Sequence, residues 1–83
     1  MKNSYYTVKV AIFTISKFAD SQYESLKKKG YDVYIETVGG FGRKKSYTVG
    51  VGKFKSKVEA EKIAETIRTK ERLKAEVIEL LSE

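Results

Sequence analysis

Two related stretches set the architecture of this chain: YTVKVAIF at Tyr6–Phe13 and YTVGVGKF at Tyr47–Phe54. Both alternate β-branched or aromatic residues with polar or small ones, which is the pattern of a strand with one buried face. The similarity continues downstream in the same register. Such internal similarity indicates one supersecondary unit used twice. We therefore expect a single domain over residues 1–83, with half-repeats at about 5–38 and 46–80.

The alternation assigns a face to each residue of these two strands. In the first strand, the side chains expected to point into the core are Tyr6, Val8, Val10 and Ile12. Those expected to point outward are Tyr5, Thr7, Lys9 and Ala11. In the second strand the inward residues are Tyr47, Val49 and Val51, and the outward ones are Thr48, Gly50 and Gly52. A polar or small outward face fits an antiparallel sheet that is open on one side.

A helix is expected after each strand. In the second unit, Ser56 and Glu59 have the spacing of a capping box. Behind them lies an apolar stripe of Ala60, Ile63, Ala64 and Ile67. The first helix carries Ala19, Tyr23 and Leu26 on the matching stripe, with Ser16 as its expected N-cap. It should end at Gly30, because three lysines precede this glycine and cations favour the C-terminal end of a helix.

Each unit closes on a second strand. Residues 31–38 alternate, with Tyr34 pointing outward. Another strand is expected near 75–80, with Val77 in the core, or Ile78 if the register slips by one residue. The order β-α-β-β-α-β predicts an α+β fold of the ferredoxin- or RNP-like type. Right-handed crossovers then give a four-stranded antiparallel sheet in the order 4-1-3-2, with both helices on one face and the other face free.

Composition excludes several classes of function. The 83 residues include no Cys and no His, so disulfides, zinc knuckles and the usual proton shuttle of catalysis are absent. No apolar run approaches the about 20 residues of a membrane-spanning helix. We therefore expect no enzyme, no catalytic residues, no metal, no cofactor and no membrane insertion by this segment. Seventeen Lys and Arg against eleven Asp and Glu give a net charge of +6, which favours anionic partners.

Two features of the sequence suggest a nucleotide or nucleic-acid ligand, namely a glycine-rich loop and the order of the elements. Gly39, Gly40 and Gly42 precede two lysines and suggest a phosphate cradle. Such a cradle joins a strand to a helix, whereas strands are expected on both sides of this loop. The element order also matches the RNA recognition motif, whose central strands carry stacking aromatics on their outward face. Of the two outward aromatics here, Tyr5 and Tyr34, only Tyr5 lies on a central strand. RNA or single-stranded nucleic acid on the open face stays the alternative, and a protein-interaction domain is a third possibility.

Both strand motifs resemble the signature strands of the SPOR (sporulation-related repeat) domain. That family typically reads aromatic-x-V-Q-V-G-A-F and Y-R-V-R-V-G-P-F. The segment Leu26–Tyr34, LKKKGYDVY, is similar to its L-K-x-K-G-Y-D-A-Y. The resemblance implies a noncatalytic module that binds bacterial peptidoglycan, preferring glycan strands whose stem peptides amidases have removed. It implies a domain of a longer exported or membrane-anchored protein of cell division or wall remodelling, located in the cell envelope, periplasmic or cell-wall-associated, and concentrated at the septum. We expect the domain to be monomeric.

In SPOR domains the glycan lies across the open sheet face, so the resemblance implies contacts there. The family's frequent Gln falls on Lys9, and its two strand-three arginines fall on Thr48 and Gly50, which are departures from the pattern. Lactyl carboxylates of the glycan could pair with Lys9 or the loop cations, and its sugar rings with outward tyrosines. The expected glycan-binding residues are Tyr5, Thr7, Lys9, Ala11, Tyr34, Arg43, Lys44, Lys45, Thr48 and Gly50.

Overall fold

The computed structural model of the chain describes residues 3–39 and 44–82. Its elements follow the predicted order, and a π-helical turn, η1, extends the second helix. In chain order they are β1 (Asn3–Phe13), α1 (Ser16–Lys28), β2 (Val33–Val38), β3 (Ser46–Phe54), α2 (Lys57–Thr66), η1 (Ile67–Glu71) and β4 (Glu76–Ser82). All strand pairs are antiparallel, and the sheet order β2-β3-β1-β4 is the predicted one.

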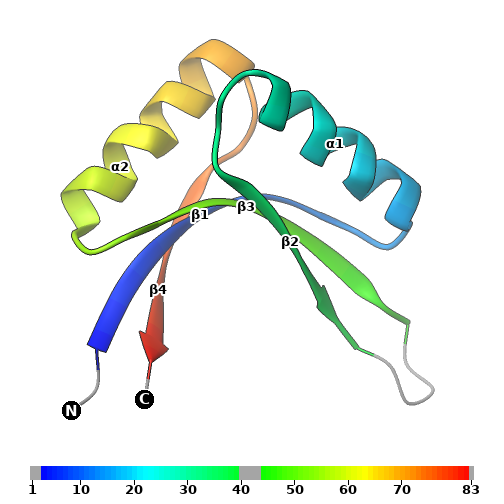
Figure 1. Cartoon of the computed structure of the whole chain (residues 1–83), viewed down its shortest axis with the longest axis horizontal. Coiled ribbons are helices and arrows are strands. Elements are labelled where there is room, and N and C mark those ends of the chain that lie inside the picture. The colour runs from blue at the N-terminus through cyan, green and yellow to red at the C-terminus, as the bar shows by residue number, and fades with distance from the viewer. Residues whose placement is uncertain (1–2, 40–43, 83) are drawn as a thin grey trace.

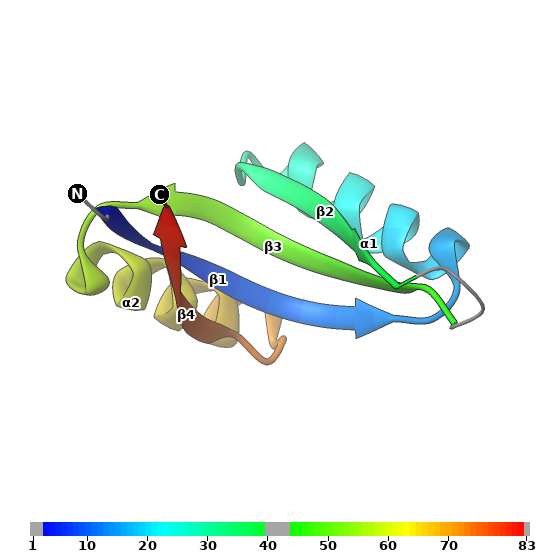
Figure 2. The same cartoon turned by 90° about the horizontal axis from the view of Figure 1, so that it is seen from below.

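Both helices pack on the same face of the sheet (Figure 1). The opposite face, which we call the open face, carries no helix of the described residues (Figure 2). The ends of the sheet strands also meet, because Asn3 of β1 pairs with Ser82 of β4. The start of β1 and the end of β4 therefore lie side by side at one end of the sheet (Figures 1 and 2).

The core lies between the helices and the sheet. The sheet contributes mainly valines: Val8, Val10, Val33, Val49 and Val51. The helical segments contribute the predicted stripes, of which the buried members are Ala19, Leu26, Ala60, Ala64 and Ile67. Alanines at the interface let the helix backbones approach the strands closely, so valine-sized side chains fill the layer without large voids.

A β-bulge in β1 changes the predicted faces of two residues. The register of β1 against β3 shifts at Val10; beyond it Ala11 lies opposite Val49, and Ile12 lies opposite Thr48. Directly opposite residues share a face, and Val49 is fully buried in the core. Ala11 therefore points toward the helices, and the prediction that it points outward is wrong. Ile12, predicted to be in the core, instead lies on the open face and is 53% exposed.

A second bulge lies in β3 and depends on Gly52. Between the pairs Tyr6–Phe54 and Val8–Val51, β3 contains one residue more than β1. Gly52 has a φ of +71°, in the left-handed region that residues with a Cβ rarely adopt. The extra residue turns Phe54 toward the helices, where it packs against the core together with Tyr6.

The helix ends follow the sequence signals with one exception. Ser56 is the N-cap of α2, and its side chain accepts a hydrogen bond of 3.2 Å from the backbone N–H of Glu59, as the capping box predicts. Gly30 follows α1 with a φ of +93°, also as predicted. At the start of α1, however, Ser16 is already helical and Ile15 occupies the N-cap position. The prediction of Ser16 as the cap is wrong.

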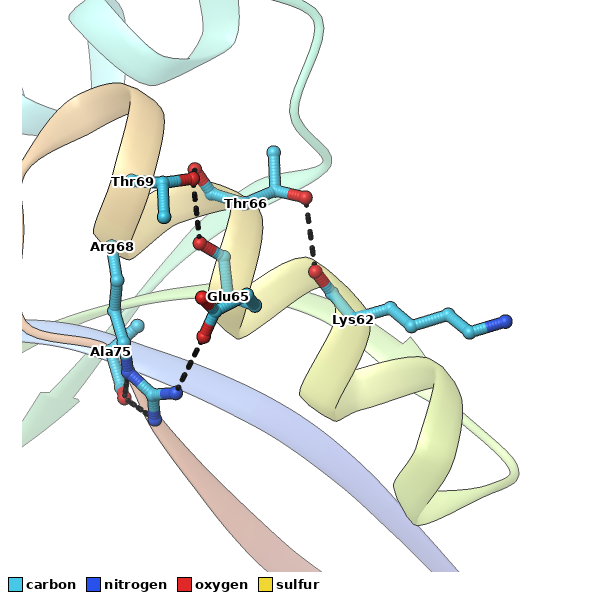
Figure 3. Close-up of polar contacts among 6 residues, drawn as sticks. All are labelled: Lys62, Glu65, Thr66, Arg68, Thr69 and Ala75. Carbon is cyan, nitrogen blue, oxygen red and sulfur yellow. Dashed lines mark hydrogen bonds and ion pairs between the residues drawn. The ribbon is translucent and has the colours of Figure 1, made fainter.

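Arg68 of η1 holds the connection from α2 to β4 (Figure 3). Its Nε donates to the backbone carbonyl of Ala75 at 3.0 Å, and its guanidinium lies 3.6 Å from the Glu65 carboxylate. Arg72 has a φ of +56° and ends the helical segment, after which the chain reverses into β4. In that strand Val77 packs against the core, as predicted.

Candidate functional site

All four strands form the open face (Figure 2). Their outward side chains come together on it. Between β1 and β4 the opposed pairs on this face are Tyr5 with Leu80, Thr7 with Ile78, and Lys9 with Glu76. Between β2 and β3 they are Tyr34 with Gly50, and Glu36 with Thr48. The surface therefore mixes aromatic, apolar and charged groups, and a ligand lying on it would contact several strands at once.

Tyr34 reaches from the edge strand β2 across β3 to β1. Its ring lies over Gly50, where an added Cβ would be only 2.5 Å from the Tyr34 Cζ. Its hydroxyl lies 2.7 Å from Thr7 Oγ1, which also donates to the backbone carbonyl of Gly52 at 2.8 Å. Thr7 is consequently only 3% exposed. The Tyr34 ring thus covers the middle of the open face, and the contact with Thr7 holds its hydroxyl end.

A shallow hollow of about 420 Å³ lies next to this ring. Its lining residues are Tyr5, Tyr34, Ile35, Glu36, Lys53 and Leu80. The Lys53 ammonium lies 5.8 Å from the centre of the Tyr5 ring, close enough for a cation–π contact. The lining thus offers two aromatic rings, two aliphatic side chains, one cation and one carboxylate. The rings suit a ligand with apolar ring faces, and the Lys53 ammonium suits an anionic substituent on it.

A larger hollow of about 690 Å³ lies along the exposed side of α2. Its lining comes from this helix alone and consists of Lys57, Val58, Glu61, Lys62, Glu65 and Thr66. It offers no aromatic ring, and its charges are those of an ordinary solvated helix face. The open face is therefore the better candidate site.

Five of the ten predicted site residues lie together at or beside the hollow. Tyr5 and Tyr34 line the hollow, whereas Thr7 and Gly50 lie beneath the Tyr34 ring. Lys9 is beside them on the open face but forms a 3.6 Å ion pair with Glu76.

The remaining predicted residues lie elsewhere. Thr48 is half-buried between Ile12 and Glu36 on the open face. Lys44 and Lys45 are exposed before the start of β3, on the far side of Thr48 from the Tyr34 ring. Ala11 faces the helices, and Arg43 lies outside the described residues.

Four residues of the hollow are absent from the predicted site: Ile35, Glu36, Lys53 and Leu80. The alternation of β2 and β4 could have revealed Glu36 and Leu80, since each lies two residues from an outward-facing neighbour. Lys53 depends on the bulge at Gly52 and had no such signal.

A polar cluster on the helix side joins the two halves of the chain. The Glu71 carboxylate accepts a hydrogen bond from the Tyr31 hydroxyl at 3.1 Å and forms an ion pair with Lys29. The hydrogen bond from Lys29 is the largest of the effects that lower the pKa of Glu71. Burial, followed by the hydrogen bond to Glu71, raises the pKa of Tyr31. This cluster links the end of α1 to the end of η1, and none of its residues lines the hollow.

No group of three metal-ligating side chains is found within residues 3–39 and 44–82. Within the same ranges, every helix is too short or too polar to cross a membrane.

Comparisons with known proteins agree on one family. The family model described as SPOR domain matches residues 2–79 of the chain. Among solved structures, the chain is similar to the solution structure of the peptidoglycan binding domain of the B. subtilis cell wall lytic enzyme CwlC. The two chains share 27% sequence identity with a TM-score of 0.71, and the match covers 98% of this chain and 92% of that domain. No curated protein sequence matches the chain.

Proposed function

Because the chain belongs to the SPOR domain family, we propose that it binds peptidoglycan and prefers glycan strands that lack stem peptides. It does so without catalysis, as the targeting module of a cell-division or wall-remodelling protein in the cell envelope. The family membership and the similarity to a peptidoglycan binding domain support this proposal. The single observation that carries it is the hollow on the open face, with Tyr5, Tyr34 and Lys53 around it.

The two tyrosines suit the sugar rings of the glycan. A pyranose has an apolar C–H face and polar edges, and aromatic side chains provide flat apolar surfaces with a polar tip. Tyr5 comes from β1 and Tyr34 from β2, so a glycan strand that contacts both would lie across the strands rather than along one of them. This arrangement supports binding in the interior of a glycan strand.

Lys53 supports the preference for peptide-free strands. Removing a stem peptide leaves a free lactyl carboxylate on the sugar, so a denuded strand is an anionic polymer. Lys9 is paired with Glu76, whereas Lys53 lies at the hollow against the Tyr5 ring. The net charge of +6 adds a general attraction for such a strand. We therefore assign the carboxylate contact to Lys53 in place of Lys9.

The test is co-sedimentation of the domain with purified sacculi, either untreated or digested with an amidase. We expect binding to increase after digestion, and Tyr34→Ala and Lys53→Ala to weaken it. Lys62→Ala is the matched control, because Lys62 is exposed on α2, away from the open face. A folded domain that binds neither preparation would disprove the proposed function.

Nucleic acid is the second candidate, favoured by the excess of basic residues and by the aromatic rings on the open face. Glu36 at the hollow and Glu76 beside Lys9 repel any anionic ligand. They oppose nucleic acid more strongly, because it carries a phosphate at every nucleotide, whereas a denuded glycan carries a carboxylate only on every second sugar. Oligonucleotide binding whose logarithm falls linearly and steeply with the logarithm of salt concentration would favour this alternative. We expect only weak binding at near-physiological salt.

A further inference from the structure

We propose that Thr7 and Gly50 position the Tyr34 ring, so that the ligand meets a preformed platform and contacts the ring face rather than the hydroxyl. Both are positioning residues, since they act through Tyr34. The proposal rests on the proposed function for the identity of the ligand. The position of the ring, in contrast, can be measured without any ligand.

The hydrogen bonds around Thr7 fix the direction of the Tyr34 hydroxyl. A threonine hydroxyl has one proton to donate. The acceptors near Thr7 Oγ1 are backbone carbonyls, that of Gly52 at 2.8 Å and that of Val51 at 3.4 Å. Because Thr7 gives its proton to a carbonyl, the 2.7 Å contact with Tyr34 uses the tyrosine proton. The Tyr34 hydroxyl is therefore a donor to the sheet and has no proton left for a ligand.

Gly50 provides the space in which the ring lies. A Cβ at this position would be 2.5 Å from the Tyr34 Cζ, 2.6 Å from its hydroxyl oxygen and 2.8 Å from Cε1. The ring thus occupies the volume that any other side chain at position 50 would take. One ring face rests on the β3 backbone, and Tyr34 also lines the hollow on the solvent side.

These two restraints act on the two side-chain torsions of Tyr34. Contact with Gly50 fixes the tilt of the ring, and the bond to Thr7 fixes the end that reaches β1. A ring that is already held loses little further freedom when a ligand binds. Thr7 and Gly50, which the sequence predicts as ligand contacts, thus share one role, which is to place the Tyr34 ring.

The first test removes the anchor. Thr7→Val should lower the affinity for amidase-treated sacculi about three- to tenfold, the range expected for one hydrogen bond. Thr7→Ser keeps the hydroxyl and should restore affinity. Thr66→Val is the matched control: its hydroxyl also bonds to a backbone carbonyl, that of Lys62, but it lies on α2 (Figure 3). An unchanged affinity in Thr7→Val would overturn the proposal.

The second test reads the ring position by NMR in the absence of ligand. The Gly50 Hα that takes the direction of a Cβ lies under the Tyr34 ring and should be shifted upfield by its ring current. Tyr34→Ala should abolish this shift, and Thr7→Val should reduce it while Thr7→Ser preserves it. A Gly50 Hα shift that is the same in Thr7→Val and in the unaltered chain would show that Thr7 does not position the ring.

The third test distinguishes an anchor from a ligand contact. Tyr34→Phe removes the same hydrogen bond from the other side, so its loss of affinity should equal that of Thr7→Val. The double variant should then bind no more weakly than either single one. If the two losses add, the Tyr34 hydroxyl contacts the ligand and the proposal is overturned. If the unaltered chain binds no sacculi, the proposed function fails, whereas the Gly50 shift still decides whether the ring is positioned.

Discussion

Replacing Gly50 with alanine measures how tightly Tyr34 lies on the sheet. The new Cβ would be 2.5 Å from the Tyr34 Cζ, so the ring has to move. The movement breaks the hydrogen bond between Tyr34 and Thr7, a loss of about 1 kcal/mol. It also adds repacking strain of about 1–3 kcal/mol. We expect the free energy of unfolding to fall by about 2–4 kcal/mol, with a decrease in Tm of roughly 4–8 °C for each kcal/mol in a domain of this size.

The same substitution should have the opposite sign when Tyr34 is absent. In a Tyr34→Ala background the new Cβ meets no ring, and alanine in a strand is favoured over glycine by about 0.5–1 kcal/mol through backbone entropy. Urea unfolding of the unaltered chain, the two single variants and the double variant measures the coupling between positions 34 and 50. We expect a coupling free energy of about 2 kcal/mol or more. An equal cost of Gly50→Ala in both backgrounds would refute the placement of the ring.

Three further substitutions test other parts of the structure. Gly52→Ala should lower the free energy of unfolding by about 1–2 kcal/mol in urea titrations, because the φ of +71° is unfavourable for alanine. The lowered pKa of Glu71 means that its ion pair contributes stability at and above the ordinary carboxyl value of 4.5, and this contribution is lost as pH falls through the lower folded-state pKa. Thermal unfolding between pH 7 and pH 3 should therefore show a gap between Glu71→Gln and the unaltered chain that closes in acid. Lys53→Ala should weaken sacculus binding by a factor that shrinks as salt is added, because the exposed charge is screened; a factor independent of salt would contradict the assigned carboxylate contact.

Local pattern was sufficient to predict the element order, the sheet order and most of the core. Val8, Val49 and Val51 alternate without interruption, and their burial follows from that alternation. The errors in β1 begin at Val10, where the bulge shifts Ala11 and Ile12 to the opposite faces from those predicted. A bulge depends on how two strands far apart in sequence pair with each other. No residue type near Val10 indicates one.

The outward placement of the two tyrosines could be predicted from the sequence, but the residues that hold the Tyr34 ring in place could not. Tyr5 and Tyr34 were identified as outward tyrosines, and both line the hollow. The sequence predicts Thr7 and Gly50 as ligand contacts, whereas in the structure the Tyr34 ring lies over Gly50 and its hydroxyl contacts Thr7. That arrangement requires a side chain on β2 to cross β3, a contact between three strands that periodicity within one strand cannot reveal. Lys53 was missed for the same reason, because its placement follows the bulge at Gly52.

The pairing of the start of β1 with the end of β4 determines how the domain responds when it is pulled. Asn3 and Ser82 form one end of the β1–β4 ladder, so pulling the chain ends apart acts across these strands rather than along them. Hydrogen bonds in an antiparallel ladder run perpendicular to the strands and are then loaded one after another, as in a zipper. Strand β4 would peel from the edge of the sheet first, while the pairing of β1, β3 and β2 beneath Tyr34 stays intact. Leu80 would leave the hollow together with β4, whereas the Tyr34 ring and its hydrogen bond to Thr7 would stay in place.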